Sequence, residues 1–405
     1  MKAPTIAFVL ALAAAAAAQD EVHAYKAARI WPAGGAPLEP GVLVVVGGKV
    51  AAVGGADTAI PEGATVHDLG SAVITPGLVD ASWHRSGSAE DRNEQSTEVT
   101  PQMRALDAWD PLDPQVRRAL AGGVTTLHCT PGNRAVIGGL GVVVKTVPGP
   151  NGSVVLEDEV SLRITMGAEP SMGNRAIRGG SVDSIYYRRP TTRMGVVWEV
   201  RRAFSKAQDY QQRTIAEGAP QDPAMEVLVR ALQGKVTVIT TARAEQDIRT
   251  ALRLADEFGY KTAIDEGVES HVLVDELAAA GTTVLVGAPS ADRVAGAGGG
   301  DGAEPRWSTL SRLAAAGVPF VVTTGGNANA LPLGQEAMFA VRFGLTPEQA
   351  LDAVTLRPAR VLGVDDRVGS LAPGKDADFV VWNTDPFDPT AVATAVHVNG
   401  IRTQD

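Results

Sequence analysis

Few side chains in this chain could do chemistry, because it holds six histidines and one cysteine. His84 and Glu266 are the main candidates, since an imidazole nitrogen or a carboxylate oxygen can take up a proton or bind a metal ion. Cys129 with the adjacent His128 could act as a nucleophile. Neighbouring strand residues point to opposite faces, however, so these two cannot easily pair. A buried, unreactive Cys129 is the favoured interpretation, and His271, at the start of a predicted helix, is interpreted as structural.

Length, composition and charge limit the classes of protein to which this chain can belong. The chain has 405 residues, of which 45% are hydrophobic, and this is enough for one domain of catalytic size and a smaller one. Its 44 glycines suit many tight strand-to-helix turns. A net charge of −10 argues against a nucleic-acid partner, since no basic face is available for phosphates. A single cysteine allows no intramolecular disulfide and says nothing about the redox compartment.

The N-terminus indicates export. Lys2 precedes an apolar run from Ile6 to Ala18, and Ala16 to Ala18 form a small-residue cleavage site before Gln19. This pattern predicts a signal peptide over residues 1–18 and a secreted or periplasmic protein, with a buried N-terminal helix as the alternative. The run is too short to span a bilayer comfortably. No later stretch reaches membrane-spanning length without charges, so we expect no membrane span after cleavage.

The two chain ends and the middle show different patterns. Strands are predicted over residues 41–46 and 49–53, around a Gly47-Gly48 turn, and again near the C-terminus over 379–382 and 395–398. Between residues 236 and 323, short strands alternate with helices, which requires right-handed crossovers and a parallel sheet. A closed (β/α)8 barrel and an open doubly wound sheet both satisfy this alternation. A dinucleotide fold is disfavoured because no Gly-x-Gly-x-x-Gly lies between a strand and a helix.

Residues 131–235 fit the alternation less well. Extended segments are predicted over 142–147, 153–156 and 161–165, joined by Pro-Gly and Asn-Gly turns, and a helix over 199–212. We interpret this region as a long insertion on the barrel, at one rim.

Three stretches together resemble the amidohydrolase superfamily, particularly its imidazolonepropionase-like branch. They are Ile74 to Ala81, Ala121 to Thr126, and a long segment from Leu345 through Pro358 to Asp378. The resemblance covers essentially the whole mature chain. It implies an α/β protein with a (β/α)8 TIM-like barrel over residues 77–369. It also implies a small composite β-sandwich built from residues 19–76 and 370–405.

The resemblance also implies one or two divalent metals at the C-terminal rim of the barrel, where the metal lowers the pKa of a bound water. The family's ligand positions are mostly changed in this chain. The first strand usually ends in His-x-His, the fifth presents a histidine, the sixth His-Gly and the eighth an aspartate that shuttles protons. The matching positions here are Ser82 and His84, Thr241, Glu266-Gly267, and Gly325-Gly326. No His, Asp or Glu lies in 237–244 or 318–330, so these two losses survive a shift in alignment.

His84, Lys145 and Glu266 remain as candidate metal ligands, with Glu266 also the candidate catalytic residue. Lys145 resembles a lysine that is carboxylated and bridges two metals in parts of the superfamily, although an ordinary solvated or ion-paired lysine is the alternative. A catalytic zinc needs about three protein ligands and an open position. Three candidates on three separate segments make a poor site.

These losses favour a non-catalytic protein without a cofactor, which either binds a small molecule or associates with itself or with an intact amidohydrolase homologue. The alternative is an active hydrolase of non-peptide C–N bonds, amide or cyclic amide, that uses zinc or another divalent metal in a reduced site. A third option is a metal-free activity that uses Glu266 and His84.

Overall fold

A computed structural model describes residues 21–84, 89–94, 96–149, 154–172, 174, 189–217, 220–287 and 305–403. The predicted signal peptide, residues 1–18, lies outside these ranges. None of the helices in the described part of the chain is long and apolar enough to cross a membrane.

An eight-stranded sheet forms the centre of the α/β fold, in the order β14-β13-β12-β11-β10-β9-β8-β7. Its strands are β7 (Leu78–Trp83), β8 (Val124–Cys129), β9 (Ile137–Lys145), β10 (Val155–Thr165), β11 (Thr237–Thr241), β12 (Thr262–Asp265), β13 (Val284–Gly287) and β14 (Phe320–Thr323). Runs of Val, Ile and Leu are buried on both faces, as expected for strands covered by helices. The two strands at the ends of this order, β7 and β14, meet at an isolated bridge between Trp83 and Gly325, so the sheet is consistent with a barrel.

One strand of this sheet runs against the others and corrects the expected insertion. β9 pairs antiparallel with both β8 and β10, while β10 pairs parallel with β11. Only residues 130–136 join β8 to β9, and 146–154 join β9 to β10. These links are too short for a crossover helix, so each can only return the chain antiparallel. The segments at 137–145 and 155–165 therefore belong to the main sheet and are not an insertion at its rim.

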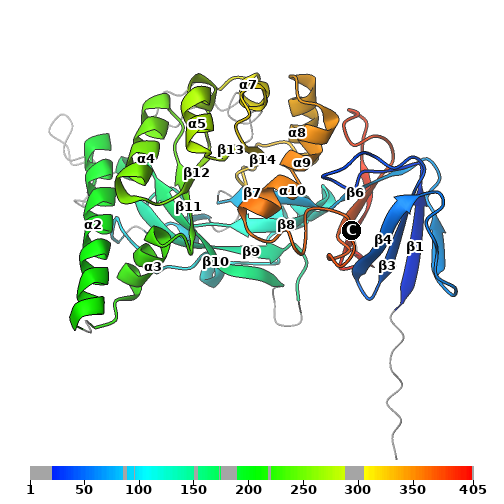
Figure 1. The fold of residues 1–405 in the computed structure, drawn as a ribbon, viewed down its shortest axis with the longest axis horizontal. Helices are drawn as coiled ribbons and strands as arrows, with labels where there is room; N and C mark the ends of the chain where they lie inside the picture. Colours follow the sequence, from blue (N-terminus) through cyan, green and yellow to red (C-terminus); the bar gives the residue numbers. More distant parts are fainter. Residues whose placement is uncertain are drawn as a thin grey trace, which may run out of the picture.

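Helices line the sheet on one side and at one end (Figure 1). The α-helices are α1 (Pro114–Ala121), α2 (Arg193–Glu217), α3 (Pro223–Leu232), α4 (Glu245–Phe258), α5 (Val274–Ala280), α7 (Thr309–Ala315), α8 (Leu333–Arg342), α9 (Pro347–Ala353) and α10 (Leu356–Val361). Short 3-10 helices are η1 (Ala89–Arg92), η2 (Ala105–Ala108), η3 (Glu169–Ser171) and η4 (Ser270–Val272). Local sequence sets several helix starts: Asp113 and Asp222 cap α1 and α3, and Thr346 forms a capping box with Gln349.

Strands from both ends of the chain form two smaller sheets, at the opposite end of the molecule from α2 (Figure 1). One has the order β4-β3-β1-β5 and the other β17-β16-β15-β6-β2. Their strands are β1 (Val22–Ala27), β2 (Arg29–Ile30), β3 (Gly41–Val46), β4 (Lys49–Gly55), β5 (Thr65–Asp68), β6 (Val73–Pro76), β15 (Phe379–Trp382), β16 (Ala393–Val398) and β17 (Ile401–Arg402). β6 pairs with β15, which joins the two chain ends in one sheet. Tyr25, Leu43 and Phe379 are among the residues of their shared apolar core.

Candidate functional site

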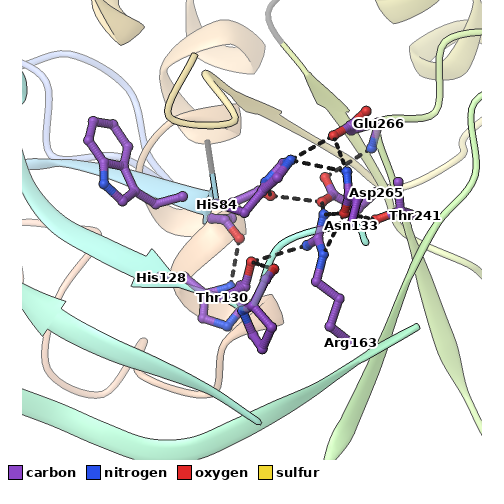
Figure 2. Close-up of polar contacts among 12 residues, drawn as sticks. His84, His128, Thr130, Asn133, Arg163, Thr241, Asp265 and Glu266 are labelled. Atoms are coloured by element: carbon purple, nitrogen blue, oxygen red, sulfur yellow. Dashed lines mark hydrogen bonds and ion pairs between the residues drawn. The ribbon is translucent and has the colours of Figure 1, made fainter. Parts of the chain in front are cut away.

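Polar side chains converge where the strands of the main sheet end (Figure 2). Carboxyl ends of parallel strands meet at one edge, and in (β/α)8 barrels that edge carries the chemistry. His84 follows β7, Arg163 lies near the end of β10, Thr241 ends β11, and Asp265 and Glu266 end and follow β12. All five are buried, so each polar group needs a partner inside the protein.

His84 is held on both ring nitrogens. Its Nε2 lies 2.7 Å from Glu266 Oε1, and its Nδ1 lies 3.1 Å from Ser82 Oγ. Glu266 has a φ of 55°, a backbone conformation that costs energy for a residue other than glycine and that surrounding contacts must maintain. The sequence-based candidates His84 and Glu266 are therefore in direct contact, across two strands that are far apart in sequence.

Arg163 occupies the middle of this rim. Its Nη2 lies 2.9 Å from Asp265 Oδ2, and its Nε and Nη2 donate to Asn133 Oδ1 at 2.9 and 2.7 Å. Thr241 Oγ1 donates to the same amide oxygen at 3.2 Å. Figure 2 shows these groups around Asn133, whose Nδ2 also donates to Glu266 Oε1 at 3.1 Å. Arg163 is 1% exposed, so its charge is neutralised within the protein and not by solvent.

A second arginine completes the charge balance. Arg243 Nε lies 2.7 Å from Glu266 Oε2. Two guanidinium groups, from Arg163 and Arg243, thus face two carboxylates, Asp265 and Glu266. We call these four side chains the rim ion network. Buried charges are tolerated when opposite charges are paired in this way.

Ser82, His84 and Glu266 are in contact in the arrangement of a hydrolase triad, with the imidazole between a hydroxyl and a carboxylate. The Ser82 hydroxyl nevertheless lies closer to Asp265 Oδ2, at 2.7 Å, than to the imidazole. Its single proton is therefore engaged by a carboxylate. Ser82 is 1% exposed and His84 2%, so both side chains are buried in this arrangement.

The family's aspartate position after β14 holds glycine in this chain, and the backbone there also disfavours an aspartate. Gly325 and Gly326 both have a positive φ, of 64° and 63°, a region where an aspartate would be strained. A Cβ at Gly325 would lie 3.6 Å from Cε1 of His84. The backbone thus has a left-handed conformation that favours glycine at the position where the family has a carboxylate.

Asp80 on β7 is the buried carboxyl group next to this turn. Its Oδ2 accepts from the Thr324 hydroxyl, and its Oδ1 accepts from the Ser82 amide at 3.3 Å. Burial raises the pKa of Asp80 to about 7, because it outweighs these hydrogen bonds, and the nearby Asp265 charge adds to the rise. Asp80 therefore ties β7 to β14 at the rim.

Replacement of Asp80 by Asn should change how stability depends on pH. A carboxyl group whose folded-state pKa lies above its unfolded value of 3.8 contributes stability that is complete below that value and is lost as the pH rises through about 7. The free energy of unfolding of the wild type should therefore fall relative to Asp80→Asn between pH 4 and 7. Urea denaturation of both proteins across this range measures the difference between their free energies of unfolding. The contributions of the other titrating groups are common to both proteins and cancel in this difference. A constant difference would contradict the raised pKa.

Lys145 does not reach the rim, which corrects its place among the candidate ligands. It lies opposite Thr126 in the pairing of β9 with β8, towards the start of β8. Its Nζ lies 2.7 Å from Asp376 Oδ2 and 3.0 Å from Asp378 Oδ1, and donates to Asn399 Oδ1 at 2.5 Å. Because β9 is antiparallel, its C-terminal end points away from the rim. Lys145 instead joins the main sheet to the smaller sheets.

Three other residues weighed from the sequence, His128, Cys129 and His271, have structural contacts. His128 Nδ1 donates to the Ala81 carbonyl at 2.7 Å, and burial lowers the pKa of His128 to about 4, so it is neutral. Cys129 accepts from Arg92 at 2.9 Å, and burial raises the pKa of its thiol, which suppresses the reactive thiolate. His271 is buried, with Nδ1 3.3 Å from the Val268 carbonyl.

The comparisons with known proteins agree on one family. A model described as the amidohydrolase family matches residues 232–403. An amidohydrolase structure from Thermotoga maritima is 30% identical, covers 94% of this chain and 99% of its own, and superposes with a TM-score of 0.83. The chain belongs to the amidohydrolase family.

Two curated relatives in the amidohydrolase family show how far the similarity extends. An imidazolonepropionase from Cereibacter sphaeroides is 28% identical over 383 residues, 85% of this chain and 88% of its own length. The amidohydrolase tasK from Hapsidospora irregularis is 29% identical over 402 residues, which cover 91% of this chain. The chain spans only 40% of the length of that relative.

The amidohydrolase family usually uses a divalent metal at this rim, and the residues present here do not fit one. Both nitrogens of His84 and both oxygens of Glu266 already face protein partners. Two buried arginines lie at the site, and their positive charge would repel a cation. In the described part of the chain, no three His, Cys, Asp or Glu side chains are grouped as metal ligands. The donor set is thus that of a closed ion network.

Sequence reasoning missed four members of this site: Asn133, Arg163, Arg243 and Asp265. Arg163 could have been noticed as a charged residue in the apolar strand Ser161 to Thr165, where a buried charge needs a partner. Asn133 lies in the short link between β8 and β9, which carried no signal.

Proposed function

We propose that this chain keeps the amidohydrolase fold without metal-dependent hydrolysis, and acts as a small-molecule-binding barrel or as a partner subunit. The observation that carries the proposal is the buried Arg163 guanidinium, bonded to Asp265 and Asn133 at the rim. It places positive charge where the reaction of the family needs a cation. Loss of a proton-transfer group costs a further factor of about 100 to 10,000 in rate, and Gly325 supplies none.

Replacement of His84 by Gln tests this proposal. We expect the wild type to show no metal-dependent amidase activity, and His84→Gln to leave the metal content unchanged. Metal analysis and hydrolysis of amide and cyclic amide substrates, with and without added zinc, measure both. Stoichiometric metal in the wild type that is lost in His84→Gln, together with a hydrolytic activity, would overturn the proposal.

An active hydrolase of non-peptide C–N bonds is the second candidate. It is supported by the identity to the Thermotoga amidohydrolase over nearly its whole length and by imidazolonepropionases among the relatives. It would require the rim ion network to open so that His84 and Glu266 bind zinc or another divalent metal. Zinc-dependent activity that disappears in Glu266→Gln would favour this candidate.

A small cavity beside Asp80 supports the ligand-binding version. It has a volume of about 80 Å³, and Trp83, Arg118 and Leu331 are among its lining residues. The lining combines apolar surface with a carboxyl group and a guanidinium group, which suits a small polar molecule.

The finer architecture is part of the same proposal. We propose that the eight-stranded sheet closes as a (β/α)8 barrel, and that residues 19–76 and 370–405 form one composite β-sandwich domain. The bridge between Trp83 and Gly325 and the pairing of β6 with β15 support this organisation.

We also propose export to the periplasm or the exterior, with cleavage after Ala18. The apolar run and small-residue site at residues 6–18 support this. Mass spectrometry of the exported protein should find Gln19 as the first residue, and an intact Met1 would contradict it.

Self-association is the partner arrangement that we propose. Met194 is 79% and Trp198 61% exposed, one turn apart on the same side of α2, and exposed apolar clusters of this kind often mark interfaces. Sedimentation velocity should give a larger species for the wild type than for Trp198→Ser. If the wild type alone is monomeric but co-sediments with an intact amidohydrolase when the two are mixed, the hetero-oligomer is indicated instead.

A further inference from the structure

Two histidines of the smaller sheets face each other at a distance that suits a shared metal ion. His23 lies on β1 and His67 on β5, which pair in parallel, with His67 opposite Tyr25. His23 Nδ1 lies 3.1 Å from His67 Nε2. Two nitrogens bonded at about 2.05 Å to one ion lie about 2.9 Å apart at a right angle and about 3.3 Å apart at the tetrahedral angle. The observed separation falls between these values.

The packing around this pair holds one ring in place and leaves the other open. The Tyr25 ring stacks on His67, with centroids 4.7 Å apart and planes at 12°. The His23 side chain is 26% exposed, so water can complete the coordination of a bound ion. Glu21 lies 3.5 Å from His23 Nε2, on the side away from His67. A carboxylate there favours a proton on Nε2 and leaves the Nδ1 lone pair for a ligand bond.

The rest of the chain offers no competing imidazole at the surface. Four of its six histidines, His84, His128, His271 and His397, are buried, and so is Cys129. A divalent transition-metal ion that meets the folded protein therefore finds accessible nitrogen ligands at this pair.

We propose that His23 and His67 form a labile binding site for a divalent transition-metal ion such as zinc or copper. Imidazole suits both ions, and two protein ligands with water leave the ion exchangeable, unlike a structural site with four protein ligands. The site lies on the smaller sheets and is separate from the rim ion network. It goes beyond the proposed function, which concerns the rim alone.

Titration of the metal-stripped full chain with zinc tests the proposal, with calorimetry as the measurement. His23→Gln and His67→Gln should each weaken zinc binding at least tenfold, while Glu348→Gln, an exposed carboxylate elsewhere, should not. Copper(II) bound to the wild type should show an electron paramagnetic resonance spectrum of two nitrogen ligands, reduced to one in either variant. Urea denaturation of the variants confirms that they fold.

Equal zinc affinity in the wild type and both variants would overturn this site, as would copper bound without nitrogen ligands. Zinc binding by the His84→Gln variant distinguishes failure of this site from failure of the proposed function. Zinc that is lost in His84→Gln but kept in His67→Gln would place the ion at the rim. That result would contradict both the site at His23 and His67 and the proposal that the rim binds no metal. Zinc kept in His84→Gln and lost in His67→Gln is the expected result.

Discussion

Replacement of Lys145 by Met should destabilise the protein by about 3–5 kcal/mol, because it removes one partner from a buried ion cluster. The lysine is fully buried and bridges two carboxylates, Asp376 and Asp378. Burial raises the pKa of Asp378 despite the Lys145 charge, and one of its oxygens has no hydrogen-bond partner. Without the lysine, that carboxylate would be buried beside Asp376 with less to neutralise it. Urea denaturation measures the free energy of unfolding.

Lys235→Met is the matched control for this prediction. Lys235 is exposed, so its replacement should change stability by no more than about 0.5 kcal/mol. Adding Asp378→Asn to Lys145→Met should recover part of the loss, since it removes the stranded charge. Equal stabilities of Lys145→Met and Lys235→Met would show that the cluster does not join the main sheet to the smaller sheets.

Replacement of Arg163 by Met should have an effect of similar size at the rim, about 3–5 kcal/mol, for the same physical reason. Asp265 would lose its guanidinium partner while remaining fully buried, and Asn133 would lose two donors. The Ser82 hydroxyl donates to the same carboxylate, so its hydrogen bond would also be disturbed. Thermal or urea denaturation of the single variant measures the loss.

A double-mutant cycle separates the pair from the packing of the long side chain. Asp265→Asn alone should also destabilise, and the two changes together should cost less than the sum of the single changes. The control is Arg201→Met, which breaks an exposed pair with Glu257 and should cost about 1 kcal/mol or less. Additive effects of Arg163→Met and Asp265→Asn would mean that the two charges do not interact, and the proposed replacement of the metal centre would lose its main support.

Both predictions concern ion clusters at residues where the family resemblance implied a metal site. At the rim, Arg163 and Arg243 neutralise the carboxylates that a cation would otherwise bind. At the other end, Lys145 is an interior tether and not a metal bridge. In each case the chain balances buried charge with its own side chains.

The sequence by itself determined the α/β class, the family and the strands at both chain ends. Runs of β-branched residues such as Val42 to Val46, next to a Gly-Gly turn, favour a strand, and the long motif ending at Asp378 is specific. The sequence also singled out His84 and Glu266 as candidates, but on separate segments, and their direct contact is known only from the structure. These conclusions rest on local pattern, which survives in the folded protein.

Only the tertiary structure decided where charges meet. The antiparallel course of β9, which depends on two short links, took Lys145 away from the rim. Nothing in the sequence around Arg163 or Asn133 states that they lie beside Asp265, since these contacts join segments that are far apart in the chain. The facing of His23 and His67 likewise depends on β1 pairing with β5 in one register. Local patterns set strands and helices, whereas the partners of a buried polar group depend on the register and direction of the whole sheet.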